Sequence, residues 1–440
     1  MEGLIMTAQI LLSLSILVAV HEMGHLLAAK YFGMRVEQFS IGFPPKIWSF
    51  TKGGTEYALS AIPLGGYVKI SGMIDESLDL EKMKKDPEPW EFRSKPAWQR
   101  LIVMLGGIIV NVVMGVFIFI LLTWLVGDSY VPNAAVNANG GIHALELAEE
   151  IGLKTGDKII KINGNEFENF EQIYNPDALL TSDASYTVDR NGEILQIEIP
   201  SNFIENFNDK GKALSFAMPR MAPVIGRIEE GSLANRLGLQ VGDRFTSING
   251  VPVTYYDEVD RLKKIGANDS IQFTIMRGTQ VLSFADFMGP NKTIGFNPKG
   301  FNFEFATTNY GFGESVVMGT QRAFGIVFTQ LKAFKKLFSG ELSFRKSMSG
   351  PIGIAQAYGG DWDWERFWRM TGLLSMVLAF MNLLPIPALD GGHVVFLSYE
   401  MISGRKPSDK FLEIAQKAGM VFLLGLMVFI FANDIIKLFQ

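Results

Sequence analysis

The sequence contains no cysteine and only four histidines among its 440 residues. The first absence excludes disulfide bonds, thiolate metal sites and cysteine nucleophiles, although it leaves the cellular compartment open. Charged residues make up only 19% of the chain, and a net charge of −5 gives no argument for a polyanionic partner. We therefore expect a protein that does not bind nucleic acid.

Charge is missing altogether from four long runs of the sequence. Hydrophobic residues make up 48% of the chain and the mean hydropathy is +0.19, which is too apolar for an ordinary soluble protein. A membrane span needs about 20 mostly apolar residues, so these runs predict a multi-pass α-helical membrane protein with four spans. The runs are 4–20, 101–126, 370–389 and 418–433, the last lengthened by the flank from residue 411.

Basic residues predict how these spans are oriented. Lysine and arginine are frequent between the first two runs, from Arg35 to Lys95, and recur after the third, from Arg405 to Lys410. Short loops rich in such residues stay in the cytoplasm. We therefore expect residues 127–369 and both termini on the outer side. The N-terminus lacks the positive segment of a secretory signal, so the first run is expected to be a retained membrane helix.

The motif His21-Glu22-Met23-Gly24-His25 directly follows the first uncharged run. Residues spaced i and i+4 share one face of a helix, so the two imidazoles can bind a single metal while Glu22 stands beside them. Ionisable groups at membrane depth are costly and indicate function by default. Because catalytic zinc sites generally take three protein ligands, this motif leaves the site one ligand short.

A candidate for the third ligand closes the third uncharged run. The stretch from Asn382 to Asp390 contains Pro385 and Pro387, which are expected to break the helix. Freed backbone at membrane depth is tolerated where it is buried in protein or lines a water-filled cavity. Asp390 is therefore the preferred ligand and His393 is its rival. A proline-kinked helix that simply ends at the membrane boundary is the alternative interpretation.

The loop between the first two runs reads as a β-hairpin beside the membrane. Residues 46–51 and 55–60 have strand character and are joined by a turn at Gly53-Gly54. The continuation, residues 62–70, ends as an apolar strand that can present an unpaired edge. A linker strand packed on the helices is the alternative.

The outer region holds an internal repeat, in which residues 152–164 recur as 238–250, an offset of 86 residues. Each copy reads Gly-Leu, Gly-Asp, an apolar strand and Asn-Gly, which predicts a helix end, a turn, a strand and a second turn. The pattern resembles circularly permuted PDZ domains of bacterial periplasmic proteases. We therefore expect two tandem α+β PDZ-like domains that either bind extended peptides by strand addition or act as steric bulk.

An amphipathic basic helix is expected at 316–338, with apolar residues on one face and Arg322, Lys332, Lys335 and Lys336 between them. Such a helix can lie on the outer leaflet of the membrane or pack against the outer domains. The stretch Ser349-Gly350-Pro351-Ile352-Gly353 then breaks the chain before the third run.

Together these features resemble the site-2 protease family of intramembrane zinc metalloproteases. The resemblance rests on the His-Glu-x-x-His motif, the Asn-x-x-Pro-x-Pro-x-Leu-Asp-Gly motif, and the paired repeats between the second and third runs. It implies that His21, His25 and Asp390 bind Zn²⁺, that Glu22 is the acid–base catalyst, and that Asn382 handles substrate.

The resemblance also implies the remaining parts of the machinery. A sheet-like membrane-associated hairpin falls on residues 42–72, where Gly65, Gly66 and Tyr67 are expected to bind an unwound substrate strand. The implied substrates are single-span membrane proteins, such as an anti-sigma factor of a stress response after an upstream site-1-type protease has trimmed it, or signal-peptide remnants. The implied place is the lipid bilayer of a bacterial inner membrane, with the PDZ-like repeats and both termini periplasmic.

Two alternatives come from other functional classes. The chain can be a catalytically inactive membrane scaffold that binds peptides through its repeats, or a metal transporter. The transporter is disfavoured because the membrane runs contain a single ionisable cluster and no chain of sites across them.

The expected parts follow one another along the chain. They are a first transmembrane helix with the zinc motif (1–34), a cytoplasmic loop with the hairpin (35–97), a second transmembrane helix (98–127), two PDZ-like domains (128–215 and 216–305), an amphipathic helix and connector (306–365), a third transmembrane segment with the third ligand (366–395), and a cytoplasmic loop with the fourth transmembrane helix (396–440).

Overall fold

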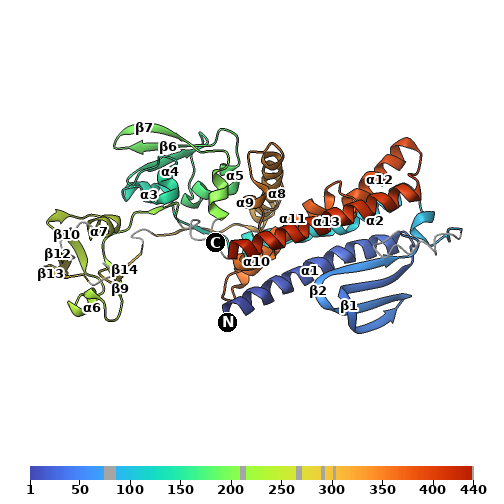
Figure 1. Ribbon diagram of the computed structural model, residues 1–440, viewed down its shortest axis with the longest axis horizontal. Helices are drawn as coiled ribbons and strands as arrows, with labels where there is room; N and C mark the ends of the chain where they lie inside the picture. The colour runs from blue at the N-terminus through green and yellow to red at the C-terminus, as the bar shows by residue number, and fades with distance from the viewer. Residues whose placement is uncertain (74–85, 209–214, 264–269, 289–292, 301–303, 439–440) are drawn as a thin grey trace. The chain divides into compact units, whose positions relative to one another are not determined.

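The computed structural model describes residues 1–73, 86–208, 215–263, 270–288, 293–300 and 304–438. The chain forms two compact units. The first unit joins Met1–Gly127 to Asn309–Gln440, and the second is Asp128–Thr308. Figure 1 shows that helices dominate the first unit, whereas the second contains most of the short strands.

Three helices of the first unit are long and apolar enough to cross a membrane, counted over the described residues. They are α1 (Glu2–Tyr31), α2 (Ala97–Leu125) and α13 (Asp409–Leu438). A helix satisfies its own backbone hydrogen bonds, which is why uncharged runs of this length become helical in lipid. The helices predicted from the first, second and fourth uncharged runs are therefore present, and the last extends beyond its run in both directions.

The third uncharged run is helical only as far as Leu383, where α11 (Trp364–Leu383) ends, and the next helix, α12 (Asp390–Ser403), begins directly after the run. Leu384 is already extended, and Ala388 has a φ of 79°. Proline lacks the N–H that continues a helix and disfavours helical backbone at the residue before it, so Pro385 and Pro387 account for the interruption. The predicted break is confirmed, and the described residues contain no fourth helix that meets the same criterion of length and hydropathy.

The predicted hairpin is confirmed, but its strands are longer than expected. Strand β1 (Val36–Lys52) and strand β2 (Thr55–Ile70) turn at Gly53-Gly54, both with positive φ. The pairing register of both strands is irregular. As a result, residues 36–41 of β1 pair with 56–59 and also with 66–70 of β2. The resulting order of segments is 46–52, 55–60, 36–41 and 66–70. The stretch 66–70 is thus an edge of this sheet, as the sequence predicts.

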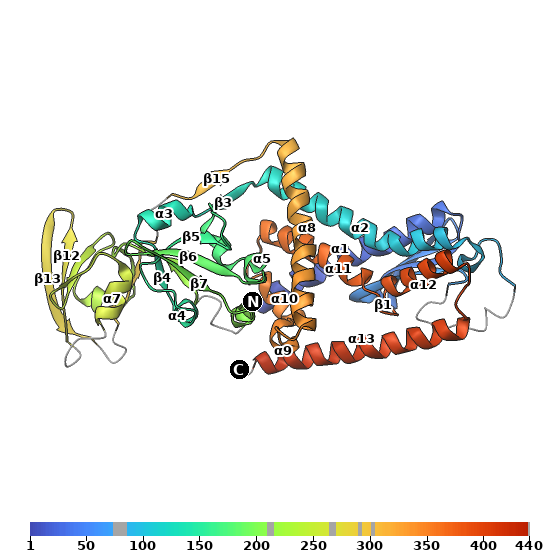
Figure 2. The same ribbon diagram turned by 90° about the horizontal axis from the view of Figure 1, so that it is seen from above.

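The predicted amphipathic helix is α8 (Phe312–Phe338), and it packs against α2 and α11. Figure 2 shows it running across α2. A Cβ on Gly319 would lie 2.6 Å from the Ile120 Cα, and the rings of Phe334 and Phe380 are 5.5 Å apart. The sequence predicted that this helix lies on the outer leaflet or packs against the outer domains. It did not predict the contacts with α2 and α11, because those helices are distant in the chain.

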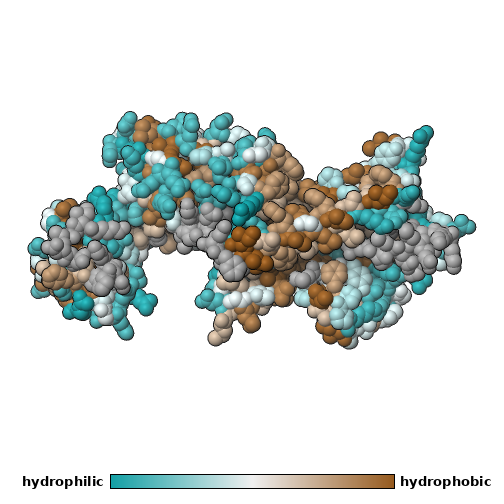
Figure 3. Space-filling model, viewed as in Figure 1, coloured by the Kyte–Doolittle hydropathy of each residue, from teal (hydrophilic) through white to brown (hydrophobic). Residues whose placement is uncertain are grey.

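Among the described residues of the first unit, three short elements accompany these helices. They are η2 (Phe92–Ser94), α9 (Phe344–Ser347) and α10 (Pro351–Ala357). The carboxylate of Asp434 on α13 accepts hydrogen bonds from the backbone N–H of Gly350 at 2.8 Å and of Ile352 at 2.9 Å. Figure 2 shows most of α13 running apart from α1 and α2, and Figure 3 shows apolar residues gathered over α11 and α13.

The second unit contains two repeats with separate hydrophobic cores, flanked by the paired strands β3 (Asp128–Tyr130) and β15 (Ala306–Thr308). The first repeat has α3 (Asn133–Ala138), β4 (Ile142–Ala144), α4 (Glu146–Glu150), β5 (Lys158–Ile162), η3 (Phe170–Tyr174), α5 (Pro176–Leu179), β6 (Ser185–Arg190), β7 (Glu193–Glu198), η4 (Phe203–Asn208) and β8 (Ala217–Pro219). The second has β9 (Ile225–Ile228), α6 (Leu233–Arg236), β10 (Arg244–Ile248), β11 (Val251–Pro252), α7 (Tyr256–Leu262), β12 (Ser270–Arg277), β13 (Gln280–Phe287) and β14 (Phe296–Pro298).

The repeated sequence forms the same local structure twice. A short helix precedes each Gly-Leu, a strand follows each Gly-Asp, and the Asn-Gly turn has positive φ at Asn163 and Asn249. Each repeat also has the same ion pair. Arg190 binds Asp157 at 2.7 Å, and Arg277 binds Asp243 at 2.7 Å. The repeat predicted from the sequence is therefore structural as well.

The Asp243 carboxylate supports a prediction about acid stability. Burial raises its pKa, but hydrogen bonds from Arg277 and from the Gln240 N–H outweigh burial and hold the pKa below the usual value. A depressed folded pKa adds stability that is complete above the unfolded pKa, about 3.9, and is lost as pH falls toward the folded pKa. We expect Asp243→Asn to speed amide hydrogen exchange in β10 and β12 at pH 7. We also expect the stability of the second repeat to fall less in Asp243→Asn than in wild type as the pH is lowered.

Hydrogen exchange on the full chain, read separately for each repeat, measures this effect. Asp157→Asn is the matched control, since it removes the equivalent carboxylate of the first repeat. It should speed exchange in β5 and β6 and leave β10 and β12 unchanged. Unchanged exchange in the second repeat of Asp243→Asn would contradict the prediction.

Candidate metal centre

Helix α1 brings His21 and His25 together as the motif predicts. The spacing of four residues puts both rings on one helix face. Their Nε2 atoms are 3.2 Å apart, and the ring centroids are 4.8 Å apart. Two imidazole nitrogens therefore point to one place, the arrangement needed to share a metal ion.

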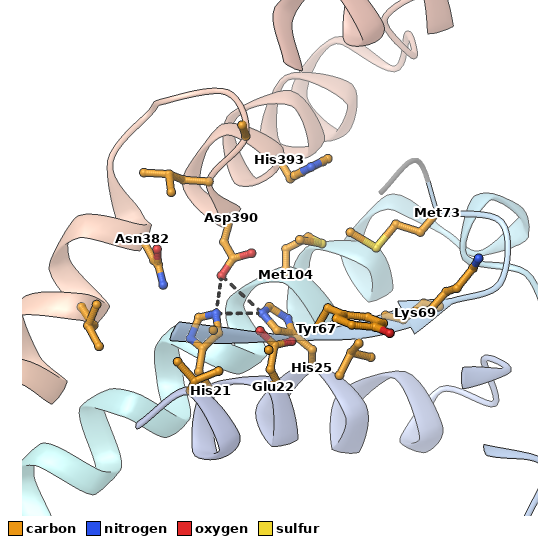
Figure 4. Close-up of a pocket in the computed structure, with 18 of the residues that line it drawn as sticks. His21, Glu22, His25, Tyr67, Lys69, Met73, Met104, Asn382, Asp390 and His393 are labelled. Carbon is orange, nitrogen blue, oxygen red and sulfur yellow. Dashed lines mark hydrogen bonds and ion pairs between the residues drawn. The ribbon is translucent and has the colours of Figure 1, made fainter. Parts of the chain in front are cut away.

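The break between α11 and α12 supplies a carboxylate to the same place. Asp390 is the first residue of α12, and its Oδ2 lies 3.1 Å from His21 Nε2 and 3.3 Å from His25 Nε2. Figure 4 shows the three side chains converging from opposite sides of the cavity. Within the described residues, this trio is the group of metal-ligand side chains close enough to hold an ion. His393 is not part of it, and its Nε2 lies 3.1 Å from the Gln416 Nε2.

The geometry of the trio fits zinc. Nitrogen and carboxylate ligands lie about 2.0–2.2 Å from Zn²⁺ in a tetrahedral site, which places ligand atoms roughly 3.3–3.5 Å from each other. The three separations of 3.1, 3.2 and 3.3 Å are close to that range. Two imidazoles and one carboxylate also form a donor set that catalytic zinc sites use, with a fourth position left for water.

Glycines allow α1 and α2 to approach closely beside the trio. A Cβ on Gly106 would lie 2.6 Å from the Gly24 carbonyl oxygen. A Cβ on Gly107 would lie 2.5 Å from His25 Nε2 and 2.6 Å from His21 Cε1, so a side chain there would occupy the space of the imidazoles. Small residues at helix crossings are typical of packing within membranes. The site therefore depends on backbone-to-backbone contact between the two helices.

A cavity of about 670 Å³ adjoins the trio. Its walls include Glu22 and Asn382, which the sequence analysis predicted, and Figure 4 shows the Glu22 carboxylate beside the two imidazoles. The edge stretch of β2 forms another wall, including Gly65, Gly66 and Tyr67. All the predicted site residues thus border a single cavity in the first unit.

Glycine also lets the strand edge approach α1. A Cβ on Gly66 would lie 2.7 Å from the Ser40 carbonyl oxygen and 2.8 Å from Val18 Cγ1, so no larger residue fits between the strand and the helix. The other side of this stretch pairs with β1. The edge and the trio consequently face the same space.

Several polar residues of the site were not predicted from the sequence. Gln38, Gln416 and Lys417 line the cavity, but no motif marks them in the sequence. Asn111 of α2, whose Nδ2 lies 3.3 Å from His21 Nδ1, was not predicted either. The sequence could have indicated Asn111, because it is the only side-chain amide in the uncharged run of 26 residues, 101–126.

The chain is similar to a known family over most of its length. The family model of Peptidase family M50 matches residues 9–426. The regulator of sigma E protease of Haemophilus influenzae is 29% identical over 97% of this chain and 98% of its own length. A putative zinc metalloprotease of Vibrio cholerae is 28% identical, with 97% of this chain and 98% of the relative covered. The regulator of sigma-E protease RseP of Escherichia coli is 29% identical, with 98% of each covered.

The family match extends over almost the whole chain, from α1 through the break before α12 and into α13. It includes the two segments that supply the trio and the apolar helices that suit a bilayer. On these grounds the chain belongs to Peptidase family M50 and is a membrane metalloprotease.

Proposed function

We propose that this protease cleaves the transmembrane segments of single-span membrane proteins at a zinc ion held by His21, His25 and Asp390. The observation that carries the proposal is the shared cavity, which places the trio, Glu22 and a free strand edge together. Peptide hydrolysis needs the trio and Glu22, and the strand edge suits a substrate whose helix has been unwound.

The chemical roles follow from the side chains present. When bound, zinc supplies Lewis acidity and an activated water for attack on the scissile carbonyl. Glu22 takes the proton of the attacking water and delivers it to the leaving amine, a role typically worth about 10²–10⁴-fold in rate. Asn382, which lines the same cavity, offers a carboxamide that can both donate to and accept from the substrate backbone.

A transmembrane helix resists proteolysis because its peptide groups are already hydrogen-bonded. Freeing them in lipid costs several kcal/mol for each unsatisfied group. The edge of β2 near Gly65, Gly66 and Tyr67 offers backbone partners for an unwound strand, by strand addition. We infer that pairing with this edge replaces part of the lost helical hydrogen bonding and holds the scissile bond beside Glu22.

The topology that we propose has four crossings. Helices α1, α2 and α13 provide three, and α11 with the break before α12 provides the fourth, although it is interrupted. The basic loop around the hairpin and the basic segment 405–410 place the metal centre toward the cytoplasmic side, by the positive-inside rule. The repeats and both termini are then periplasmic, in the inner membrane of a bacterium.

The repeats are proposed to be PDZ-like domains that limit access to the site. Relatives are named regulators of sigma-E protease, so an anti-sigma factor trimmed beforehand by a site-1-type protease is the proposed substrate, together with signal-peptide remnants. The domain boundaries proposed from the sequence are kept, except that the first repeat extends to Pro219, because β8 pairs with β4. A substrate with an intact outer domain would be excluded by bulk, by peptide binding in the repeats, or by both.

The role of Glu22 is tested by Glu22→Gln. The amide keeps the size of the side chain but cannot accept a proton, so we expect cleavage of a transmembrane substrate to fall by at least about 10²-fold. The zinc content should stay unchanged. Glu2→Gln, the same substitution near the other end of α1, is the control and should cleave like wild type. Unchanged cleavage by Glu22→Gln with zinc bound would contradict the role of Glu22, whereas a cellular function that persists in Glu22→Gln without cleavage would favour the inactive scaffold.

Proline substitutions test the strand edge. Neighbouring residues of a strand direct their N–H groups to opposite sides, so one of Val68→Pro and Lys69→Pro removes a donor that faces the cavity. We expect that variant to cleave a helical transmembrane substrate at least about tenfold more slowly than wild type. Ser49→Pro, in the opposite edge of the same sheet, is the control.

A second substrate separates pairing from general damage to the hairpin. Helix-breaking residues at its cut site make prior unwinding unnecessary, so the loss caused by proline should be smaller for this substrate. Equal losses for both substrates, or none for either, would argue against pairing.

Deletion of the repeats tests their restricting role. Tyr130 pairs with Ala306, so residues 131–305 can be replaced by a short glycine linker without separating the ends of the remaining chain. We expect the shortened protease to cleave substrates that retain an intact outer domain, which the full chain refuses. Cleavage of trimmed substrate by both forms is the control for folding. Continued refusal of untrimmed substrate by an active shortened form would contradict the restricting role.

A further inference from the structure

Residues of α2 contact the Nδ1 atoms of both imidazoles of the candidate metal centre. His25 Nδ1 lies 2.8 Å from the carbonyl oxygen of Val103, and His21 Nδ1 lies 3.3 Å from the carboxamide of Asn111. Val103, Gly107 and Asn111 are spaced by four residues, so they follow one face of α2. Gly107 leaves room for the rings, and its two neighbours on this face contact their outer nitrogens.

The contact with Val103 defines the tautomer of His25. A carbonyl oxygen accepts hydrogen bonds and cannot donate, so the proton of this imidazole lies on Nδ1. Its Nε2 then carries a lone pair directed at His21 and Asp390, as metal binding requires. Metal-binding histidines generally have such a partner on the nitrogen that does not bind the metal.

His21 requires the same tautomer to bind a metal through Nε2, but its partner, the Asn111 side chain, can take either of two orientations. A carboxamide can present either its oxygen or its nitrogen to a neighbour. Asn111 presents Nδ2 to His21, while its Oδ1 is buried and has no hydrogen-bond donor among the described residues. The residue is only 1% exposed, so solvent does not satisfy that oxygen. A half-turn of the carboxamide would bring the buried acceptor to the Nδ1–H of His21.

We infer that Asn111 is a positioning residue of the metal centre, whose side-chain oxygen accepts the Nδ1–H of His21 and so keeps the His21 Nε2 available for zinc. The inference rests on the proposed metal site. It makes α2 the common support of both imidazoles, through a backbone oxygen for His25 and a side-chain oxygen for His21. Partners of this kind typically change metal affinity or activity by about 10–100-fold.

Zinc affinity of the full chain in detergent, measured by competition with a chelator, tests this role apart from catalysis. Asn111→Leu has a similar size but no acceptor, so we expect its zinc affinity to fall by about 10–100-fold. Asn111→Asp keeps an acceptor at the same distance and should bind zinc within a few-fold of wild type. Ser375→Ala is the matched control, because the Ser375 hydroxyl donates to the backbone oxygen of Asn111 and not to its side chain.

Nitrogen NMR of labelled histidines provides a second measurement, which remains available if Asn111→Leu does not fold. The zinc-loaded wild type should show His21 protonated at Nδ1, with an exchange-protected proton that becomes more exposed in Asn111→Ser, whose side chain is too short to reach. Wild-type zinc affinity in folded Asn111→Leu would overturn the inference, and so would a His21 proton equally protected in Asn111→Ser. Failure of the wild type itself to bind zinc would overturn the proposed metal site as well.

Discussion

The metal centre depends on the close contact between α1 and α2 at Gly24, Gly106 and Gly107. Without side chains at these positions, the two backbones approach until the imidazoles of α1 lie against α2. That approach leaves room for the rings and brings their Nδ1 atoms close to the Val103 carbonyl oxygen and the Asn111 carboxamide. The Nε2 atoms of both rings then lie near the Asp390 carboxylate. A methyl group at Gly107 would occupy this space.

The surrounding architecture follows from the cost of unsatisfied backbone in lipid. The break at 384–389 and the strand edge at 66–70 border the same cavity. At membrane depth such backbone is stable where protein or water satisfies it. The same property makes the cavity suited to a substrate that has lost its helical hydrogen bonds. In the proposed function, hydrolysis and the binding of an unwound strand therefore take place in one cavity.

Much of this fold was predictable because its signals are local. Uncharged runs predict helices, the paired Gly-Asp and Asn-Gly turns predict the repeats, and two prolines predict the break before Asp390. The parts missed are those set by distant segments. The folding of β1 between two stretches of β2, and the packing of α8 on α2 and α11, depend on surfaces that no local pattern describes.

The sequence by itself determined the chemistry of the site, since the spacing of His21, Glu22 and His25 on a helix and the proline break before Asp390 follow from local backbone preferences. The tertiary structure decided which residues meet. It selected Asp390 over His393, because only Asp390 is directed toward both imidazoles. It also placed Asn111 behind His21 and the free strand edge beside Glu22, since contacts between segments distant in the chain arise only when those segments pack.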